Sequence, residues 1–372
     1  MGVKADPTGV DIKYMQRALS LASRAKGHTS PNPMVGAVVV KNGRIIAEGY
    51  HKRAGGAHAE AAALEKAGSA ARGATVYVSL EPCCHTGLTG PCTEKIIDGG
   101  VRKVVYAVKD PDSRVNGRGV RILRKAGIEV VGNVLKEDAV RLNEIYFGNK
   151  LHKRPYIILK TVQSLDGRIA TATGDSQWIS SPESLKLAHE LRAEVDAVVV
   201  GMGTVRADNP SLTVRRVKGK NPYRIIVSGS LKFPSKCNLL DNNSDFKTIV
   251  ASSEKAIERF RRNTHRSGLI FWNVKTGRDG MLDIKDFVRK AADFGLCSLL
   301  IEGGGELVTS FLKAGLFDKY IVITAPVVIG RGADAVRDLH SRKLSDALKL
   351  KKGSCYASGC DMVFIGYPER KK

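Results

Sequence analysis

Four residues in the first third of the chain have the types and the spacing of a zinc site. His58 and Glu60 lie two positions apart, and Cys83 and Cys92 follow, each directly after a proline. One imidazole and two thiolates supply three ligands, and the fourth position of a tetrahedral zinc ion then stays open to water. A structural zinc site is closed by a fourth protein ligand, so this set favours a catalytic site.

Such a site suits hydrolysis. Zinc brings the pKa of a bound water to about 7, which makes hydroxide available to attack a ring carbon that carries an amino group. Glu60 is placed to carry protons from the water to the leaving amine. His-x-Glu followed by Pro-Cys and a later Cys is the pattern of zinc deaminases that act on nucleobases. Two alternatives stay open: a structural site with a solvated Glu60, and Cys84 or His85 as ligand in place of Cys83.

The composition predicts a two-domain globular protein. The chain has 372 residues, of which 43% are hydrophobic, and this length suits two domains better than one. No apolar run approaches the roughly 18 residues of a membrane span, and the N-terminus lacks a signal peptide, so we expect a cytoplasmic protein. Three of the seven cysteines lie within ten residues, which favours metal binding over disulfides.

The net charge of +23 is spread over both halves of the chain. A positive field attracts anionic ligands such as phosphates or nucleic acid, although a basic surface with no specific partner is an equally good interpretation. Aromatic and basic residues are not interleaved as in proteins that bind single strands. The charge therefore indicates anionic ligands without identifying them.

Helical and strand patterns alternate along both halves, which predicts α/β sheets layered by helices. Residues 143–154 are polar and basic and end at Pro155, so we place the junction there, between domains of residues 1–150 and 151–372. The first half predicts helices over 14–26, 58–67, 93–99 and 117–126, and strands over 34–40, 44–50, 74–80, 103–108 and 129–131. The second half predicts strands over 156–160, 197–200, 223–227, 247–251, 298–301 and 320–328, and helices over 182–192, 284–294 and 307–314.

The motifs of the first half resemble the deaminase half of the bifunctional riboflavin-biosynthesis deaminase/reductase family. They are the segments 31–36 (PNPMVG), 49–51 (GYH), 58–60 (HAE) and 81–87 (EPCCHTG), with Pro91-Cys92. The resemblance implies that His58, Cys83 and Cys92 are the zinc ligands and Glu60 the proton donor. The chain has Leu88 where the family commonly has a basic residue for the substrate phosphate, so another basic residue could take over that contact.

The resemblance continues through the second half and implies a dihydrofolate-reductase-like domain that uses NADPH. It is carried by the segments 164–167 (SLDG), 174–179 (GDSQWI), 203–210 (GTVRADNP) and 302–305 (EGGG). The implied NADPH contacts are Val162, Trp178, Thr204, Asp208, Gly304, Gly305, Glu306, Leu307, Val308, Thr309 and Ser310. The implied substrate contacts are Ser176, Arg192, Leu212, Arg215 and Glu302. The family usually has an aspartate where this chain has Ser228, so a contact from that position to NADPH is open.

The residue types support part of this assignment. Arg192 and Arg215 suit a ribose phosphate, because a guanidinium binds phosphate oxygens in pairs. Lys160 and Glu302 are candidates for protonating the sugar as its C1′ accepts hydride, although Lys160 could also extend from a strand end to solvent. Trp178 could belong to the core, the 302–306 turn could be without a ligand, and Asn32, a candidate substrate contact, could serve only its turn.

We therefore expect a cytidine-deaminase-like α/β/α domain followed by a dihydrofolate-reductase-like α/β domain, with Zn²⁺ and NADPH as cofactors. The expected activity is deamination of a phosphorylated diaminopyrimidine followed by reduction of its ribosyl side chain. We expect a homo-oligomer with a small-molecule substrate and neither nucleic acid nor membrane as partner. Two rival hypotheses are a nucleic-acid deaminase with an RNA-binding second domain, and a zinc-stabilised binding scaffold without catalysis.

Overall fold

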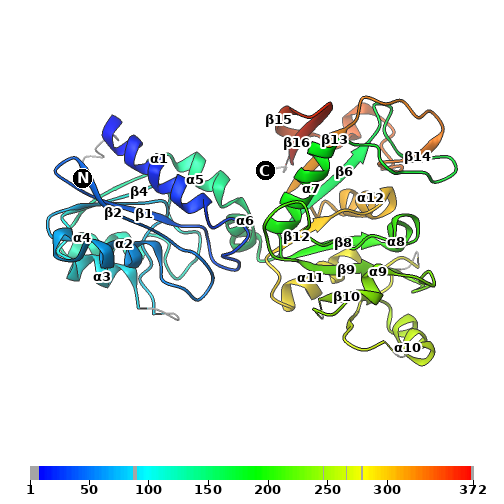
Figure 1. Cartoon of the computed structure of the whole chain (residues 1–372), viewed down its shortest axis with the longest axis horizontal. Coiled ribbons are helices and arrows are strands. Elements are labelled where there is room, and N and C mark those ends of the chain that lie inside the picture. Colours follow the sequence, from blue (N-terminus) through cyan, green and yellow to red (C-terminus); the bar gives the residue numbers. More distant parts are fainter. Residues whose placement is uncertain (1–7, 87–89, 246, 265, 278–279, 370–372) are drawn as a thin grey trace. The chain divides into compact units, whose positions relative to one another are not determined.

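A computed structural model of the chain describes residues 8–86, 90–245, 247–264, 266–277 and 280–369. The chain divides into two compact units, Met1–His152 and Lys153–Lys372 (Figure 1). Within the described ranges, no helix combines the length and the apolar character that crossing a membrane requires.

The first unit is built on a sheet whose strand order, over its described residues, is β2-β1-β3-β4-β5. Strand β1 pairs antiparallel with β2 and β3, whereas β3, β4 and β5 run parallel. The strands are β1 (Gly36–Lys41), β2 (Arg44–Tyr50), β3 (Thr75–Val78), β4 (Lys103–Tyr106) and β5 (Glu129–Gly132). The helices are α1 (Gly9–Ser23), α2 (Ala59–Ala67), α3 (Cys92–Asp98), α4 (Arg118–Lys125), α5 (Lys136–Leu142) and α6 (Glu144–His152), with a 3₁₀ turn over Gly68–Ala71.

Helices cover both faces of this sheet, as the alternating pattern predicts. Successive strand residues point to opposite faces, and accordingly Val38 and Val39 of β1 belong to two different cores. Val38 packs with α1 and α5, and Val39 packs with α2, α3 and α4. Figure 1 shows these two helix layers on either side of the sheet. The first unit is thus the expected α/β/α domain.

The segment that we interpreted as the junction contains a helix. Helix α6 occupies Glu144–His152, and the first unit ends at its last residue. Tyr146 and Lys150 lie four positions apart and therefore on one face of this helix. Both side chains line a cavity of the first unit, so the segment contributes to a site.

The second unit is built on a larger sheet with the order β11-β10-β9-β8-β12-β6-β13-β16-β15 in its described part. The strands β6 (Tyr156–Gln163), β8 (Ala197–Gly201), β9 (Tyr223–Val227), β10 (Thr248–Ser252), β11 (Ile270–Asn273), β12 (Ser298–Ile301) and β13 (Lys319–Thr324) are parallel. A C-terminal antiparallel pair, β15 (Leu350–Ser358) and β16 (Asp361–Pro368), extends it. A small sheet pairs β7 (Arg168–Thr171) with β14 (Gly332–Asp334).

Helices of the second unit lie on both faces of its sheet. Phe287 of α11 and Phe311 of α12 pack on one face with Ile249, while Ile257 of α10 packs with Val250, which points to the other face. The helices are α7 (Pro182–Glu194), α8 (Met202–Asp208), α9 (Asn238–Asp241), α10 (Glu254–Asn263), α11 (Ile284–Asp293) and α12 (Gly305–Ala314), with a 3₁₀ turn over Leu344–Asp346.

Three features of this sheet differ from the sequence-based expectation. One is β11, which was not predicted, and the other two concern the C-terminal strands. The strand predicted over 320–328 ends at Thr324, close before Pro326, which has no backbone N–H for a strand ladder. The hairpin of β15 and β16 was not predicted. Its residues 351–355 are two lysines, a glycine, a serine and a cysteine, and they give a weak strand signal.

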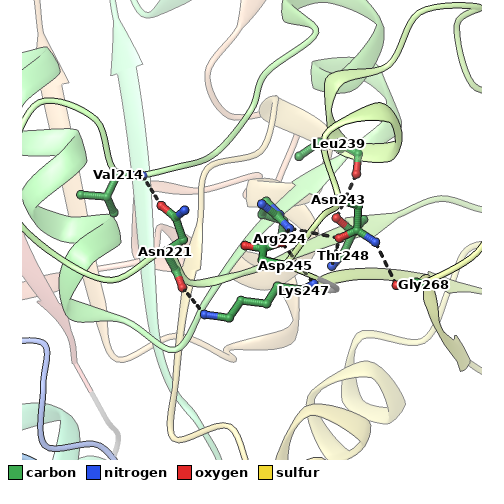
Figure 2. A network of polar contacts seen from close by, with 9 residues as sticks. All are labelled: Val214, Asn221, Arg224, Leu239, Asn243, Asp245, Lys247, Thr248 and Gly268. Atoms are coloured by element: carbon green, nitrogen blue, oxygen red, sulfur yellow. Dashed lines mark hydrogen bonds and ion pairs between the residues drawn. The ribbon is translucent and has the colours of Figure 1, made fainter.

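A network of buried polar contacts joins the chain around β9 and β10 (Figure 2). Arg224 on β9 donates to Asn243 at 3.1 Å and pairs with Asp245. The Asn243 side chain also accepts from the Thr248 amide at 3.0 Å and donates to the Gly268 carbonyl at 2.9 Å. One amide side chain thus satisfies three buried or partly buried partners.

Replacing Asn243 with Ala should destabilise the second unit by about 2–3 kcal/mol, because the Thr248 amide and the Gly268 carbonyl lose their partner. Both tryptophans, Trp178 and Trp272, lie in the second unit, so their fluorescence in a denaturant titration reports its unfolding alone. Asn242→Ala, at the exposed neighbouring position, serves as the control and should change the free energy of unfolding by less than about 0.5 kcal/mol. Equal stability of the two variants would contradict the proposed importance of the network.

Candidate active sites

The structure brings His58, Cys83 and Cys92 together in the first unit. Their ligand atoms all lie within 4.8 Å of one another. The Nδ1 atom of His58 is 3.3 Å from Sγ of Cys83 and 3.2 Å from Sγ of Cys92. Zinc bonds of about 2.3 Å to sulfur and 2.0–2.1 Å to nitrogen in a tetrahedron separate such atoms by roughly 3.5 Å. The donor types and their spacing therefore fit a zinc ion.

Helix starts position two of these residues. His58 is the N-cap of α2, and Cys92 is the first residue of α3, as the sequence predicted for both segments. The Cys92 amide donates to the Cys83 sulfur at 3.3 Å, and the Thr93 amide donates to the Cys83 carbonyl at 3.2 Å. Hydrogen bonds from Cys92 and His58 outweigh the effect of burial and lower the pKa of Cys83 to about 4, which favours the thiolate that a metal binds.

Glu60 follows His58 in the first turn of α2 and is 3% exposed. Burial and the neighbouring Cys83 thiolate raise the pKa of Glu60 to about 7. The helix reaches this position because Gly49 on β2 has no side chain: a Cβ there would lie 2.5 Å from the Ala59 carbonyl oxygen. A carboxyl group that can hold or release a proton near neutral pH is thereby placed beside the three ligands.

A cavity of about 310 Å³ opens onto this cluster. Its wall includes His58, Glu60, Cys83 and the predicted substrate contact Asn32. The Asn32 amide nitrogen lies 3.2 Å from Nε2 of His51, whose Nδ1 lies 3.0 Å from the Ala57 carbonyl oxygen. Asn32 therefore belongs to the cavity wall as well as to its turn.

The alternative ligands lie apart from the cluster. Cys84 Sγ donates to the Arg114 carbonyl at 3.5 Å, and neither Cys84 nor His85 belongs to the group of described residues that could hold a metal ion. His85 lines the same cavity. Leu88 lies outside the described residues.

Sequence reasoning missed several polar residues of this cavity. Asp110 follows β4, and its Oδ1 accepts from the Tyr146 hydroxyl at 2.9 Å and the Asp112 amide at 2.8 Å. Burial raises the pKa of Asp110 to about 6. Arg114 and Lys150 line the same wall and pair with Asp112 at 2.8 and 3.1 Å. The position of Asp110, just after a strand of a partly parallel sheet, was the available signal.

Glu81 is a second residue whose contribution was missed. Its buried carboxylate accepts from the amides of Gly117 and Val120, at 2.9 and 3.2 Å, and so satisfies the start of α4. Glu81 lies two positions before Cys83, which means that α4 anchors the loop that carries this candidate ligand. Its role is to position the loop.

The second unit contains a buried cluster of charges. Glu302 directly follows β12 and accepts from Lys160 of β6 at 3.1 Å and from Arg192 of α7 at 2.7 and 2.9 Å. Burial alone would raise the pKa of Glu302, but the charges of Arg192 and Lys160 together hold it well below its usual range. Glu302 is therefore ionised at neutral pH and is a poor proton donor, whereas Lys160 is the donor in the hydrogen bond between them.

A cavity of about 530 Å³ surrounds this cluster and contains the predicted substrate contacts. Ser176, whose hydroxyl donates to Asp208 at 2.8 Å, lies on its wall. Trp178 is 71% exposed, so it is not a core residue. The other predicted substrate contacts on this wall are Arg192, Leu212, Arg215 and Glu302, and the predicted NADPH contacts on it are Val162, Trp178, Thr204, Asp208 and Gly304. Arg192 already binds Glu302 through Nε and Nη2, which leaves Arg215 as the better placed of the two arginines for a phosphate.

A neighbouring cleft of about 540 Å³ shares Thr204 and Gly304 with this cavity. The Gly304 amide donates to the Thr204 hydroxyl at 3.0 Å, so one hydrogen bond spans the border between the two. The start of α12 faces the cleft, where free helix amides suit a phosphate. Gly305 is required by packing, because its Cβ would lie 2.2 Å from the Asp334 carbonyl oxygen. Ser228 lines the cleft and accepts from the Leu231 amide at 3.1 Å.

The 304–310 segment is only partly a cleft wall. Gly304, Gly305, Glu306, Leu307 and Ser310 line it. By contrast, Val308 and Thr309 are buried in the described structure and line neither the substrate cavity nor the cleft. The helical period turns these two side chains away from the cleft: Val308 packs in the core, and the Thr309 hydroxyl donates to Gly305 and accepts from Arg337. A direct side-chain contact from either to NADPH does not fit this geometry.

Removing Cys83 should abolish zinc binding, whereas removing its neighbour should not. We expect Cys83→Ala to lose the stoichiometric zinc of the purified protein, because two ligands remain where three are needed. Cys84→Ala is the matched control and should retain one zinc ion per chain by elemental analysis. The reverse pattern would show that Cys84 is the ligand.

Comparisons with known proteins identify the family of each unit. Residues 9–108 match the family described as the cytidine and deoxycytidylate deaminase zinc-binding region, and residues 155–364 match the RibD C-terminal domain. The riboflavin biosynthesis protein RibD of Aquifex aeolicus is 44% identical over 357 residues, which are 96% of this chain and 98% of that protein.

Two solved structures match nearly the full length. RibD of Acinetobacter baumannii has a TM-score of 0.86 at 33% identity and covers 97% of this chain and 99% of its own. A Thermotoga maritima protein described as a diaminohydroxyphosphoribosylaminopyrimidine deaminase and 5-amino-6-(5-phosphoribosylamino)uracil reductase has a TM-score of 0.82 at 34% identity, covering 96% and 99%.

The fold expectation is thus confirmed, with a cytidine-deaminase-like domain followed by a dihydrofolate-reductase-like RibD reductase domain. The expected cofactors are confirmed as well, Zn²⁺ for the deaminase domain and NADPH for the reductase domain. The chain belongs to the RibD family of riboflavin biosynthesis proteins and is a bifunctional deaminase/reductase.

Proposed function

We propose that the first unit deaminates 2,5-diamino-6-ribosylamino-4(3H)-pyrimidinone 5′-phosphate and that the second reduces the ribosyl group of the product to ribityl. The observation that carries this proposal is the presence of two separate polar cavities, one in each unit. The first contains a ligand set for zinc with an adjacent carboxyl group, and the second contains a buried lysine beside a nucleotide-sized cleft. We assign residues 1–150 to the first activity and 151–372 to the second.

In the deaminase cavity His58, Cys83 and Cys92 would hold the zinc ion. Bound there, zinc supplies an acidified water at neutral pH. Glu60 takes a proton from the attacking water and delivers protons to the ring nitrogen and to the amino group, which leaves as ammonia. Its burial supports this role, because a carboxyl group with a pKa of about 7 can both accept and return a proton.

The substrate phosphate needs a cationic partner in the same cavity. Arg114 and Lys150 are the arginine and lysine on its described wall, and we assign the phosphate contact to them. Asp112 holds both side chains in place but also neutralises part of their charge. The pair therefore offers directed donors with a modest net charge.

In the reductase cavity NADPH would supply hydride to C1′ of the sugar. Lys160 protonates the ring oxygen as the bond between C1′ and that oxygen breaks. Glu302 orients the Lys160 ammonium group and compensates its charge. The ionised state of Glu302 supports this division, since a carboxylate without a proton can serve only as an acceptor.

The cleft beside this cavity suits a phosphorylated dinucleotide. The glycine-rich start of α12 offers backbone amides, and Arg206 and Arg337 line the same cleft. Thr204 lies at the border between the cleft and the substrate cavity, where a nicotinamide ring would meet C1′. The cavity itself is lined by Val162, Trp178 and Asp208.

The proposal extends to partners and location. The substrate is a small molecule, and neither nucleic acid nor a membrane has a role in this scheme. None of the seven cysteines, all of which the structure describes, forms a disulfide, which supports a reducing, cytoplasmic environment. The edge strand β15, with the half-exposed Tyr356, supports a homo-oligomer, which the molar mass in solution tests.

Two variants test the assignment of activities in one polypeptide. Glu60→Gln should retain zinc and slow ammonia release by about 10²–10⁴-fold, while NADPH oxidation with the deaminated substrate stays unchanged. Lys160→Met should show the opposite pattern, so each variant is the folding control for the other. Undiminished ammonia release from Glu60→Gln would remove Glu60 from the mechanism, and full-rate reduction by Lys160→Met would remove Lys160.

Loss of the phosphate anchors should weaken substrate binding without affecting the chemistry. Arg114→Met and Lys150→Met should each raise KM for ammonia release several-fold, more strongly at low salt, because the lost attraction is electrostatic. Lys109→Met is the control, since Lys109 is exposed and lies outside the cavity wall. A KM equal to that of the unmodified protein in both variants would place the phosphate elsewhere.

A further inference from the structure

His189 is a buried histidine of the reductase cavity that has no role in the scheme above. It lies on α7, is 5% exposed and belongs to the cavity wall together with Arg215 and Arg216. A polar ring that is removed from bulk solvent but borders a substrate cavity is a candidate contact to the substrate.

One ring nitrogen of His189 is committed to the backbone. The Arg215 amide donates to Nδ1 at 3.1 Å, so Nδ1 is the acceptor and carries no proton. The only N–H group of the neutral ring is then at Nε2. Among the described residues, Nε2 has no hydrogen-bond partner.

The surrounding charges keep the ring neutral. Burial, followed by the charges of Arg192, Arg215 and Arg216, lowers the pKa of His189 to about 4, and Glu302 opposes this only in part. At neutral pH His189 therefore offers a single, directed N–H donor to the cavity and no positive charge.

The segment that carries the two arginines is held from two sides. The Val214 amide donates to the Asn221 side chain at 2.9 Å, and this contact is part of the network in Figure 2. The Arg215 amide is held by His189, as described above. Arg215 Nη1 donates to the Thr213 hydroxyl at 2.8 Å, which restrains the guanidinium as well. The backbone that precedes Arg216 is thus fixed relative to α7.

We propose that His189 is a specificity-determining residue of the reductase: its Nε2–H donates to a phosphate oxygen of the substrate, beside the guanidinium groups of Arg215 and Arg216. This inference rests on the proposed function, which places a phosphorylated substrate in the cavity. Two guanidinium groups attract any anion, whereas a neutral donor with a fixed hydrogen contributes only when an acceptor atom lies at the right place. His189 thereby selects for a phosphate group held in one position.

Two substitutions distinguish the acceptor role of Nδ1 from the proposed donor role of Nε2 in His189. In His189→Asn the side-chain oxygen can replace Nδ1 as acceptor for the Arg215 amide, but nothing replaces the Nε2 donor. In His189→Gln the longer side chain can bring an N–H to the position of Nε2. We would measure kcat and KM for NADPH oxidation with the deaminated 5′-phosphate substrate and with its dephosphorylated counterpart, and inhibition by inorganic phosphate, using the full chain.

We expect His189→Asn to raise KM for the phosphorylated substrate at least about tenfold, because a hydrogen bond to a charged group is lost. Its KM values for the dephosphorylated substrate and for NADPH, and its kcat, should remain close to those of the unmodified protein. Inorganic phosphate should inhibit this variant less strongly. His189→Gln should recover most of the preference for the phosphorylated substrate.

The contrary outcomes are distinct. The inference is wrong if His189→Asn keeps the full preference for the phosphorylated substrate. It is also wrong if KM rises equally for the phosphorylated and the dephosphorylated substrate. If both variants lack the preference for the phosphorylated substrate and also fail to bind NADPH, His189 acts only through the stability of the fold. That result would overturn the inference as well. If the unmodified protein oxidises no NADPH with the deaminated substrate, the proposed function itself fails.

Discussion

Parallel pairing of neighbouring strands brings their carboxyl ends to one edge of a sheet, and the sites of both units depend on this constraint. In the first unit the loop with Cys83 follows β3 and Asp110 follows β4, which are parallel neighbours. In the second, Glu302 follows β12, whose neighbour β6 carries Lys160. Side chains far apart in the sequence, such as Lys160 and Glu302, meet because the strand ladder fixes the register of their backbones.

Helix starts complete both sites at these edges. The first amides of α3 point to Cys83, and those of α12 line the cleft of the second unit. Unsatisfied helix amides carry partial positive charge, so both ends suit anionic groups, a thiolate in one case and a phosphate in the other. Both sites thus use the amides of a helix N-terminus, but for different chemistry.

The ion pairs of Glu302 in the reductase cavity determine the roles of the neighbouring charged residues. Glu302 forms ion pairs with both Lys160 and Arg192. Removal of one partner would leave an uncompensated charge in a buried site. The same pairing makes Glu302 an acceptor, leaves Lys160 as the donor and draws Arg192 away from a phosphate. Arg215, Arg216 and the neutral His189 then form the part of the wall that is open to an anion.

Residue types and local spacing were sufficient to identify the candidate zinc ligands, the proton-carrying Glu60 and many of the strands and helices. Most of the predicted strands and helices are present within a few residues, apart from the overlong 320–328 strand. Several elements were not predicted, among them α5, β7, α10, β11 and the hairpin of β15 and β16. The packing of the folded chain was needed to show that Val308 and Thr309 are buried, that Asp110 and Tyr146 meet in the deaminase cavity, and that Arg192 pairs with Glu302. These contacts join distant segments or depend on the rotation of a helix against its sheet, and neither is encoded in local spacing.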